Sequence, residues 1–169
     1  MKRILKMDSL NLNVINDDEH PIPNQDLLEK CFALVADKHN ISQAEVNVNI
    51  VSNHEIQQIN KQFRNKDKPT NIISFEFEKP EGLPEDIAND FWGDIVIAPE
   101  VLQKEALDQN KKLDHHWQHI FIHGLLHLLG YDHITDHEAE EMEGLEIELL
   151  AKLDIANPYI EQENSNVRK

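Results

Sequence analysis

The sequence has little of several residue types, and each shortage excludes a class of protein. A single cysteine, Cys31, cannot form an internal disulfide framework and favours a reducing compartment. No apolar run approaches the ~20 residues that a membrane-spanning helix needs. The basic N-terminal residues are not followed by the apolar stretch of a secretory signal. We therefore expect a soluble, cytoplasmic protein that does not bind a membrane.

Positive charge is also scarce. Sixteen Lys and Arg face 32 Asp and Glu, and the formal net charge of −16 argues against a general nucleic-acid binder, since phosphate binding uses clustered basic side chains. The charge is nevertheless polarised along the chain. Residues 61–68 hold four basic residues and one acid, whereas residues 132–148 hold eight acids and no Lys or Arg. A local basic site can therefore exist within an acidic protein.

Hydrophobic periodicity predicts a mixed fold. Apolar alternation predicts strands near residues 10–14 and 46–50, and two apolar runs predict strands near 71–77 and 93–98. Start and stop signals predict helices over 24–38, 52–65, 114–129 and 136–153, and a further helix that begins at Pro99. We expect an α/β (α+β-like) fold with about four strands in one mixed sheet and about five helices.

Length and composition predict one domain. The 169 residues suit a single domain over residues 1–157, and the polar segment 158–169 is expected to be a disordered tail. Residues 78–90 hold prolines, a glycine and acids, and are expected to form an exposed loop. In the last helix, we expect the acids to lie in solvent and four apolar residues to face inward: Met142, Leu145, Leu149 and Leu150.

Three of the ten histidines have the spacing of a metal site. His123 and His127 are four residues apart on a predicted helix, so at ~3.6 residues per turn they share one face. Gly130 ends this helix, and the turn lets His133 reach back toward the same ion. Three nitrogen ligands leave a fourth tetrahedral position for water, which is the catalytic rather than the structural pattern. The spacing predicts a catalytic zinc site at the end of a long helix.

The neighbouring histidines suit this site less well. His119 shares the face but lies ~12 Å along the helix axis from His127, so we do not expect it to be a ligand. The alternative for His123, His127 and His133 is that they are surface histidines or core histidines with satisfied hydrogen bonds. The leucines around them favour the metal, because a dry shell strengthens the effect of an ion on bound water. Such imidazole sites also accept nickel or copper.

The histidine block partly resembles the His-Glu-x-x-His motif of zinc peptidases. In those enzymes the glutamate that follows the first histidine is the general base. Gly124 stands at that position here. Its presence argues against peptidase chemistry, although a base could come from another element.

Three blocks of the sequence together resemble the YbeY endoribonuclease family. The first is the histidine block, His123-Gly124-Leu125-Leu126-His127-Leu128-Leu129-Gly130-Tyr131-Asp132-His133. The second is Arg64-Asn65-Lys66-Asp67-Lys68-Pro69-Thr70-Asn71-Ile72-Ile73-Ser74-Phe75, which is similar to the family's Arg-x-Lys-Asp-x-Pro-Thr-Asp/Asn-Val-Leu-Ser-Phe. The third is Gly93-Asp94-Ile95-Val96-Ile97. They run in the family's order, and the resemblance covers residues 10–159.

The resemblance implies a zinc-dependent, single-strand-specific endoribonuclease of bacteria. It implies a role in ribosomal RNA maturation, notably at the 3′ end of the small-subunit RNA, and in ribosome quality control. It also implies a cytoplasmic location and ribosome-linked partners. None of these expectations follows from composition.

The resemblance also places Arg64 in the cleft of the three histidines. We expect a zinc-bound water to attack a phosphodiester while Arg64 grips the phosphate through two parallel hydrogen bonds and offsets developing charge. From the sequence alone, Arg64 could equally be a solvated charge at a helix C-terminus. Three lysines could extend an RNA-binding track past the cleft or could form a solvated charge run: Lys61, Lys66 and Lys68.

Two other function classes remain open. One is a metallohydrolase that acts on another substrate class, such as a peptidase. The other is a non-catalytic ribosome assembly factor with a structural zinc, although structural sites usually have four protein ligands and favour cysteine. Closure of the site by Cys31 or a carboxylate would support that reading. The roles of Asp132 and Ser74 also stay open.

Overall fold

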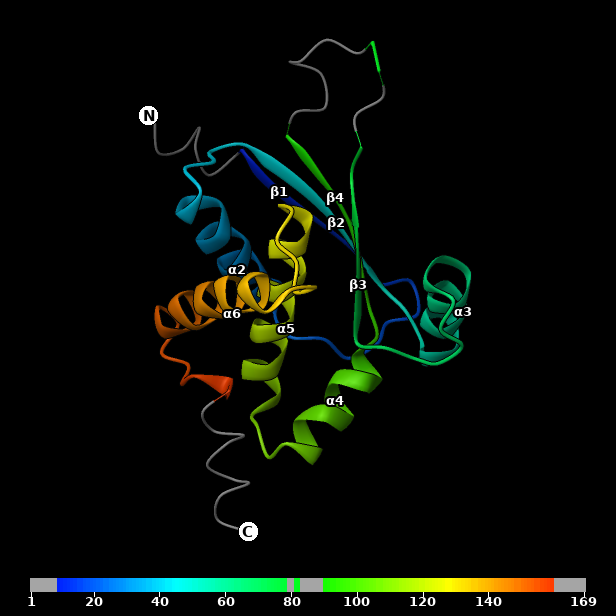
Figure 1. Ribbon diagram of the computed structural model, residues 1–169. Helices are drawn as coiled ribbons and strands as arrows, with labels where there is room; N and C mark the ends of the chain where they lie inside the picture. Colours follow the sequence, from blue (N-terminus) through cyan, green and yellow to red (C-terminus); the bar gives the residue numbers. More distant parts are fainter. Residues whose placement is uncertain (1–8, 79–80, 83–89, 160–169) are drawn as a thin grey trace.

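The protein is built on one four-stranded mixed sheet (Figure 1). The computed structural model describes residues 9–78, 81–82 and 90–159. Its strands are β1 (Leu10–Ile15), β2 (Ala44–Ile50), β3 (Ile72–Glu76) and β4 (Phe91–Ile97), in the spatial order β1-β2-β4-β3. β2 is parallel to both β1 and β4, and β3 is antiparallel to β4 at the edge of the sheet. The predicted mixed sheet is confirmed.

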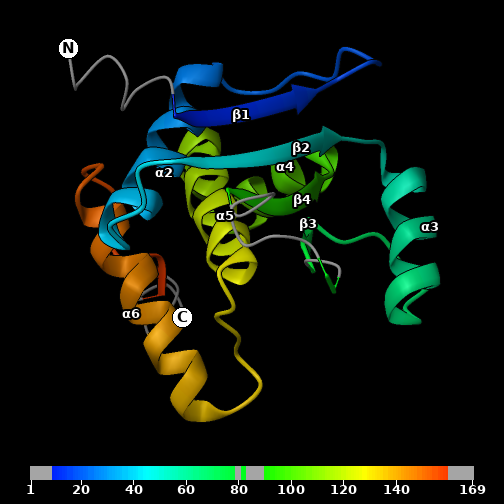
Figure 2. The same cartoon turned by 90° about the horizontal axis from the view of Figure 1, so that it is seen from above.

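Five helices accompany the sheet in the described part of the chain, as predicted (Figure 2). They are α2 (Gln25–Lys38), α3 (Asn53–Arg64), α4 (Pro99–Asp108), α5 (Leu113–Leu128) and α6 (Asp136–Ala151). Three predicted caps are confirmed. Asn24 caps α2, the Ser52–Glu55 capping box opens α3, and Gly130 follows α5 with a φ of 98°. A second capping box, Thr135 with Glu138, opens α6.

The two faces of the sheet carry different apolar clusters. Neighbouring residues of one strand point to opposite faces, so Ile72 joins the main core while Ile73 packs under α3. The main core unites α2, α5 and α6 with the first face. The smaller cluster joins Ile56 of α3 to Val96 on the second face. The edge strand β3 therefore lies between α5 on one side and α3 on the other.

Helix α5 is the central element of the main core. Trp117, Phe121 and Leu125 are at most 1% exposed, and the helix is apolar on most of its circumference, as a buried helix must be. Because α5 packs directly against β3, its C-terminal turn lies beside the edge of the sheet (Figure 1). This packing fixes the position of His123 and His127.

Two expectations differ from the structure. The acids of α6 do not all lie in solvent, because Glu146 is completely buried. The expected tail begins too early, because Pro158 is buried and Tyr159 donates a hydrogen bond to Glu146. Most of the expected loop, residues 79–80 and 83–89, and residues 160–169 of the expected tail lie outside the described residues. Within the described ranges, no helix combines the length and hydropathy needed to cross a membrane.

Candidate metal centre

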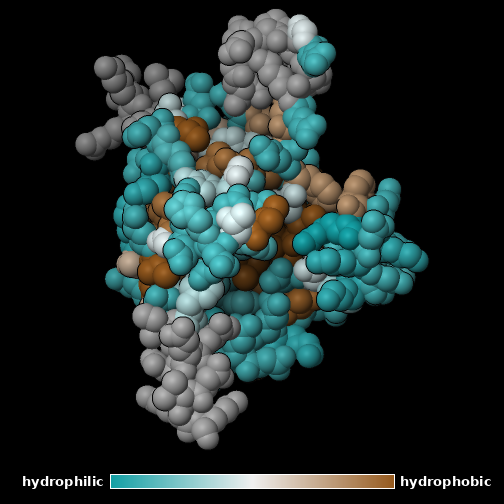
Figure 3. Space-filling view, in the orientation of Figure 1, coloured by the Kyte–Doolittle hydropathy of each residue, from teal (hydrophilic) through white to brown (hydrophobic). Residues whose placement is uncertain are grey.

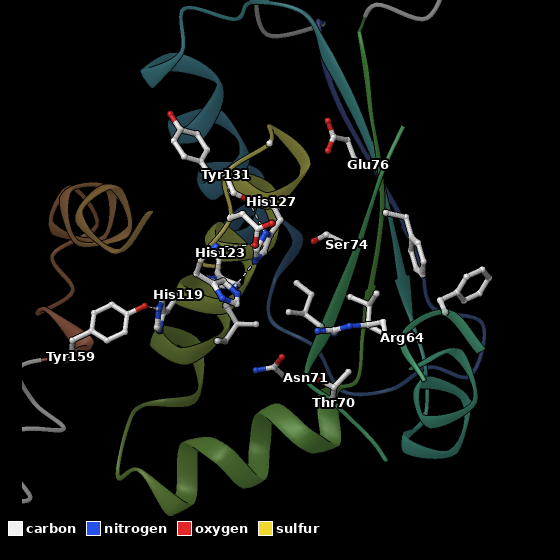
Figure 4. Close-up of a pocket in the computed structure, with 18 residues that line it drawn as sticks. Arg64, Thr70, Asn71, Ser74, Glu76, His119, His123, His127, Tyr131 and Tyr159 are labelled. Carbon is white, nitrogen blue, oxygen red and sulfur yellow. Dashed lines mark hydrogen bonds between the residues drawn. The ribbon is translucent and has the colours of Figure 1, made fainter. Parts of the chain in front are cut away.

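The three predicted histidines converge on one point. His123 and His127 of α5 and His133 of the following turn each offer a ring nitrogen, and these atoms all lie within 4.8 Å of one another. The two Nε2 atoms of His123 and His127 are 3.1 Å apart. Figure 4 shows both rings at the end of α5, turned toward the open space beside β3. The 3.1 Å between the two Nε2 atoms is close to the separation expected of two nitrogens bound to one metal ion.

The opposite ring nitrogens have fixed hydrogen-bond acceptors. His123 Nδ1 donates to a carboxylate oxygen of Glu146 at 2.7 Å, and His127 Nδ1 donates to the backbone carbonyl of Tyr131 at 2.9 Å. Since neither acceptor carries a hydrogen, the protons of the neutral rings are on Nδ1 and the lone pairs are on Nε2. The two lone pairs then face each other across 3.1 Å, and a metal cation between them would accept both. The donor set fits a metal ion.

The pKa of His127 also favours metal binding. Burial and the neighbouring His123 lower the pKa of His127 and outweigh the hydrogen bond to Tyr131, which raises it. The neutral imidazole, which is the form that binds metals, is therefore favoured at neutral pH.

His133 reaches the centre through a tight turn. Gly130 adopts a φ of 98°, which side-chain-bearing residues rarely tolerate, and reverses the chain after α5. Asp132 Oδ1 then accepts a hydrogen bond from the backbone nitrogen of His133 at 2.8 Å. The His133 ring stacks against that of His123 at a centroid distance of 5.6 Å. Asp132 thus orders the turn that carries the third histidine.

The residue that sequence reasoning missed is Glu146 of α6. Its side chain is 0% exposed, and it accepts hydrogen bonds from His123, from His119 Nε2 at 2.7 Å and from the Tyr159 hydroxyl at 2.6 Å. Burial alone would raise its pKa, but the hydrogen bonds from the two histidines lower it to about 2. The carboxylate is therefore charged and holds His123 in its ligand tautomer.

The remaining candidate ligands lie elsewhere. His119 turns toward Glu146 and Tyr159 (Figure 4), and it is not in the histidine cluster. Cys31 is 0% exposed in the main core and is also outside the cluster. Burial raises the pKa of the Cys31 thiol to about 12, so the thiolate that a metal needs is disfavoured there. In the described part of the chain, the three histidines have no fourth protein ligand beside them.

A cleft of about 680 Å³ opens in front of the histidines. Figure 3 shows the surface hollowed between the body of the molecule and α3, with hydrophobic residues visible in the hollow. One wall comes from α5 and the turn after it, and the other comes from β3 and the end of α3. Its polar lining residues include Arg64, Thr70, Asn71, Ser74, Glu76, Asp132 and the three histidines.

Arg64 shares this cleft with the histidines, as the resemblance implied. It is the last residue of α3, and Figure 4 shows its guanidinium extending from the α3 side toward the histidines. The predicted lysines are placed differently. Lys61, Lys66 and Lys68 are exposed, and none of them lines the cleft. Lys61 Nζ lies 3.8 Å from Asp67, so its charge is partly offset.

Gly124 occupies the closest contact between α5 and β3. A Cβ atom added there would lie 2.5 Å from Ile72 Cδ1 and 3.2 Å from Ser74 Oγ. The Ser74 hydroxyl donates a hydrogen bond to the Gly124 carbonyl at 2.9 Å. Ser74 therefore joins β3 to α5, the helix that carries His123 and His127. A larger residue at this position, such as the glutamate of a zinc peptidase, would require Ile72 and Ser74 to move.

Comparisons with known proteins agree with this geometry. The sequence profile of the family described as Endoribonuclease YbeY matches residues 13–154. Endoribonuclease YbeY of Francisella philomiragia is 90% identical over 158 residues, which is 94% of this chain and 100% of that protein. Endoribonuclease YbeY of Francisella tularensis subsp. holarctica is 80% identical over 168 residues, 99% of this chain and 100% of that protein.

A solved structure shares the fold. The solution structure of TM1509 from Thermotoga maritima matches with a TM-score of 0.55 at 25% sequence identity. The match covers 94% of this chain and 95% of that one. The likeness therefore extends over nearly the whole domain and is not confined to the histidine block.

Proposed function

The chain belongs to the YbeY endoribonuclease family, and from that premise we propose that it is a zinc-dependent endoribonuclease that cuts single-stranded RNA. The main support for the proposal is one structural observation. The same cleft is lined by three imidazoles and one guanidinium. The imidazoles come from α5 and the turn after it, and the guanidinium comes from α3. A metal site beside a phosphate-binding group is the arrangement that metal-assisted phosphodiester hydrolysis requires.

The histidines would hold the ion through His123 Nε2, His127 Nε2 and a ring nitrogen of His133. A zinc ion bound there supplies hydroxide at neutral pH, because it lowers the pKa of a bound water toward ~7. Glu146 and the Tyr131 carbonyl keep the two helical imidazoles in the ligand tautomer. Nickel or copper would fit the same nitrogen donors in vitro.

Arg64 would bind the scissile phosphate. Its guanidinium presents two parallel N–H groups, a geometry that lysine cannot reproduce. Charge on the phosphate oxygens grows toward the transition state, so a fixed cation in the cleft stabilises that state more than the substrate. The catalytic role of Arg64 thus rests on its place in the cleft and on the family motif.

The three lysines would act outside the cleft. Lys61, Lys66 and Lys68 surround the end of α3 next to Arg64. An RNA strand that leaves the cleft on this side would pass them. Their contribution would appear as a steep loss of RNA affinity with added salt.

The biological role that we propose follows from family membership. It is maturation of ribosomal RNA, notably the 3′ end of the small-subunit RNA, and ribosome quality control, in the cytoplasm and with ribosome-associated partners.

The two competing classes are less well supported. A mechanism of the His-Glu-x-x-His type uses the glutamate after the first histidine as its base, and Gly124 stands there in close contact with Ile72 and Ser74. An assembly factor with structural zinc needs a closed coordination sphere, and Cys31, the thiol that could close it, is buried in the main core.

Cleavage of a single-stranded ribosomal RNA fragment by metal-quantified protein tests the proposal. His127→Ala should lose metal and activity together, while Arg64→Ala should lose activity and keep metal. Lys104→Ala is the matched cation control, because Lys104 is exposed on α4 and does not line the cleft. Equal cutting by all four proteins would refute the proposal and favour the assembly factor.

A further inference from the structure

Phe63 presents an aromatic ring to solvent at the wall of the cleft. It is 60% exposed, and it is the sole aromatic residue of the exposed class in the described ranges. Among the described residues, four other large hydrophobic side chains are exposed, and none of them lines the cleft: Ile15, Leu107, Leu113 and Ile134. Because this ring is exposed within the cleft, a substrate bound there can contact it.

The Phe63 ring packs against another aromatic ring. Phe75 of β3 meets it edge to face, with a centroid distance of 5.2 Å and an interplanar angle of 75°. Phe75 is itself half-buried against the smaller apolar cluster beneath α3, which supports its position. Phe63 is nevertheless 60% exposed, so much of the residue stays accessible to a ligand. A fixed ring with a free face is preorganised for stacking, because little side-chain entropy remains to be lost.

Phe63 also lies directly beside the proposed phosphate-binding residue. Phe63 and Arg64 are the last two residues of α3, and Asn65 ends the helix with a φ of 58°. Both side chains line the same cleft as the histidines. In a nucleotide, the base is joined to its phosphate through one sugar. A group that binds a base and a group that binds a phosphate can therefore act on one nucleotide when they are neighbours.

We infer that Phe63 is a base-binding platform on which a nucleobase adjacent to the scissile phosphate stacks. The inference rests on the proposed RNA cleavage and adds the subsite that holds the base. Every base has a π-face, so the platform would tolerate any sequence. It would also favour single strands, since the bases of a duplex are already stacked on one another. Stacking supplies affinity without positive charge, which suits a protein whose formal net charge is −16.

The test combines a Phe63 variant with an abasic substrate. The zinc-loaded full chain acts on a single-stranded RNA oligonucleotide that it cuts at one position, and each flanking nucleotide is replaced in turn by an abasic one. One abasic position should raise KM about 5- to 150-fold, the range of measured base–aromatic stacking. Phe63→Leu should raise KM on the intact RNA by a similar factor and change kcat less. Phe63→Trp should retain the wild-type KM.

The decisive result is the pairing of the two changes. If the ring and that base contact each other, the KM of Phe63→Leu on the abasic RNA should be no higher than the KM of the wild type on the abasic RNA. If the two increases in KM multiply instead, the ring and the base act independently, and the inference is overturned. Leu107→Ala is the matched surface control, because Leu107 is 75% exposed and lies outside the cleft. Circular dichroism and thermal unfolding check that Phe63→Leu is folded.

Failure of the inference and failure of the proposed function give different results. A wild-type KM for Phe63→Leu, in a preparation whose wild-type protein cuts RNA, would overturn the platform alone. Absence of cutting by the zinc-loaded wild-type protein would overturn the proposed function, and the platform with it.

Discussion

Glu146 Oε2 lies 2.7 Å from His123 Nδ1, and the two residues come from different helices. The other carboxylate oxygen accepts hydrogen bonds from His119 and Tyr159. A fully buried, charged carboxylate is costly unless donors surround it, and here three donors do. Helix α5, helix α6 and Tyr159 are thus joined at a single side chain.

This relationship predicts a loss of metal affinity in Glu146→Gln. The amide keeps the shape but has one acceptor oxygen for three donors, so the orientation and basicity of His123 suffer. We expect zinc affinity to fall about 10–100-fold, as is typical when the partner of a ligand histidine is removed. Competition with a chromophoric chelator on the folded apo-protein measures this directly.

Two control variants separate this effect from a loss of folding. Tyr159→Phe removes a donor from the other carboxylate oxygen, so it should lower stability but leave zinc affinity nearly unchanged. Glu140→Gln is the exposed control on the same helix. If Tyr159→Phe weakened zinc binding as much as Glu146→Gln, the positioning of His123 would not be the cause.

Sequence reasoning found the histidines because their geometry is local. Two residues four apart on a helix share a face whatever the rest of the fold does, and a glycine after the helix predicts the turn to His133. Glu146 meets His123 across 23 residues of sequence, and no local rule gives that contact. A signal was present, however. Position 146 falls on the inward face of α6 between Met142 and Leu149, where an acid is out of place.

A second prediction concerns the geometry of the Arg64 side chain. Arg64→Lys keeps the charge but loses the paired N–H groups. Loss of one charge-assisted hydrogen bond costs about 1.5–3 kcal/mol, so kcat/KM for RNA should fall by roughly tenfold or more. In Arg64→Ala, kcat/KM should fall further, by about 10²–10³-fold. Steady-state kinetics at fixed salt measures both. Full activity in Arg64→Lys would mean that bidentate phosphate binding is not used.

The position of Arg64 could not be obtained from spacing. It lies on α3, which packs on the opposite face of the sheet from α5, and it reaches the cleft only because β3 is the edge strand. The strand order β1-β2-β4-β3 decides this, and periodicity in the sequence predicts strands but not their order. The family resemblance supplied what local patterns did not.

A third prediction concerns the contact between α5 and β3. Alanine is normally favoured over glycine in a helix by roughly 0.5–1 kcal/mol. In Gly124→Ala, the new methyl would push against Ile72 and Ser74, and overpacking typically costs about 1–3 kcal/mol. We expect a net loss of stability. Gly144→Ala in α6 is the matched control, because nothing lies within 4 Å of its Cβ and it should gain stability.

Thermal unfolding of the metal-free proteins measures the comparison. For a chain of this size, 1 kcal/mol corresponds to a change of roughly 2–4 °C in Tm. The Tm of Gly124→Ala should be lower than that of the wild type, and the Tm of Gly144→Ala should be higher. Equal gains in the two variants would show that the helix can move away from β3 at no cost.

The fourth prediction concerns acid stability and uses a carboxylate that does not contact the three histidines of the metal centre. Glu105 accepts hydrogen bonds from His116 Nε2 at 2.9 Å and from the Asn71 amide at 3.1 Å, and it joins α4 to α5 and to the start of β3. Burial raises its pKa, but these hydrogen bonds and the nearby histidines outweigh burial, so the net pKa is lowered from 4.5. The folded state therefore binds the Glu105 proton less tightly than the unfolded state does.

The sign of the pH effect follows from linkage. A lowered folded-state pKa contributes stability that is fully present above the unfolded value of 4.5 and is lost as the pH falls through the lower folded value. Urea unfolding of the wild type should therefore show a decline in free energy below about pH 4.5 that is shallower in Glu105→Gln. Glu140→Gln, which alters an exposed carboxylate, should keep the wild-type slope. Identical acid slopes for the wild type and Glu105→Gln would mean that the contact between Glu105 and His116 does not favour the charged carboxylate.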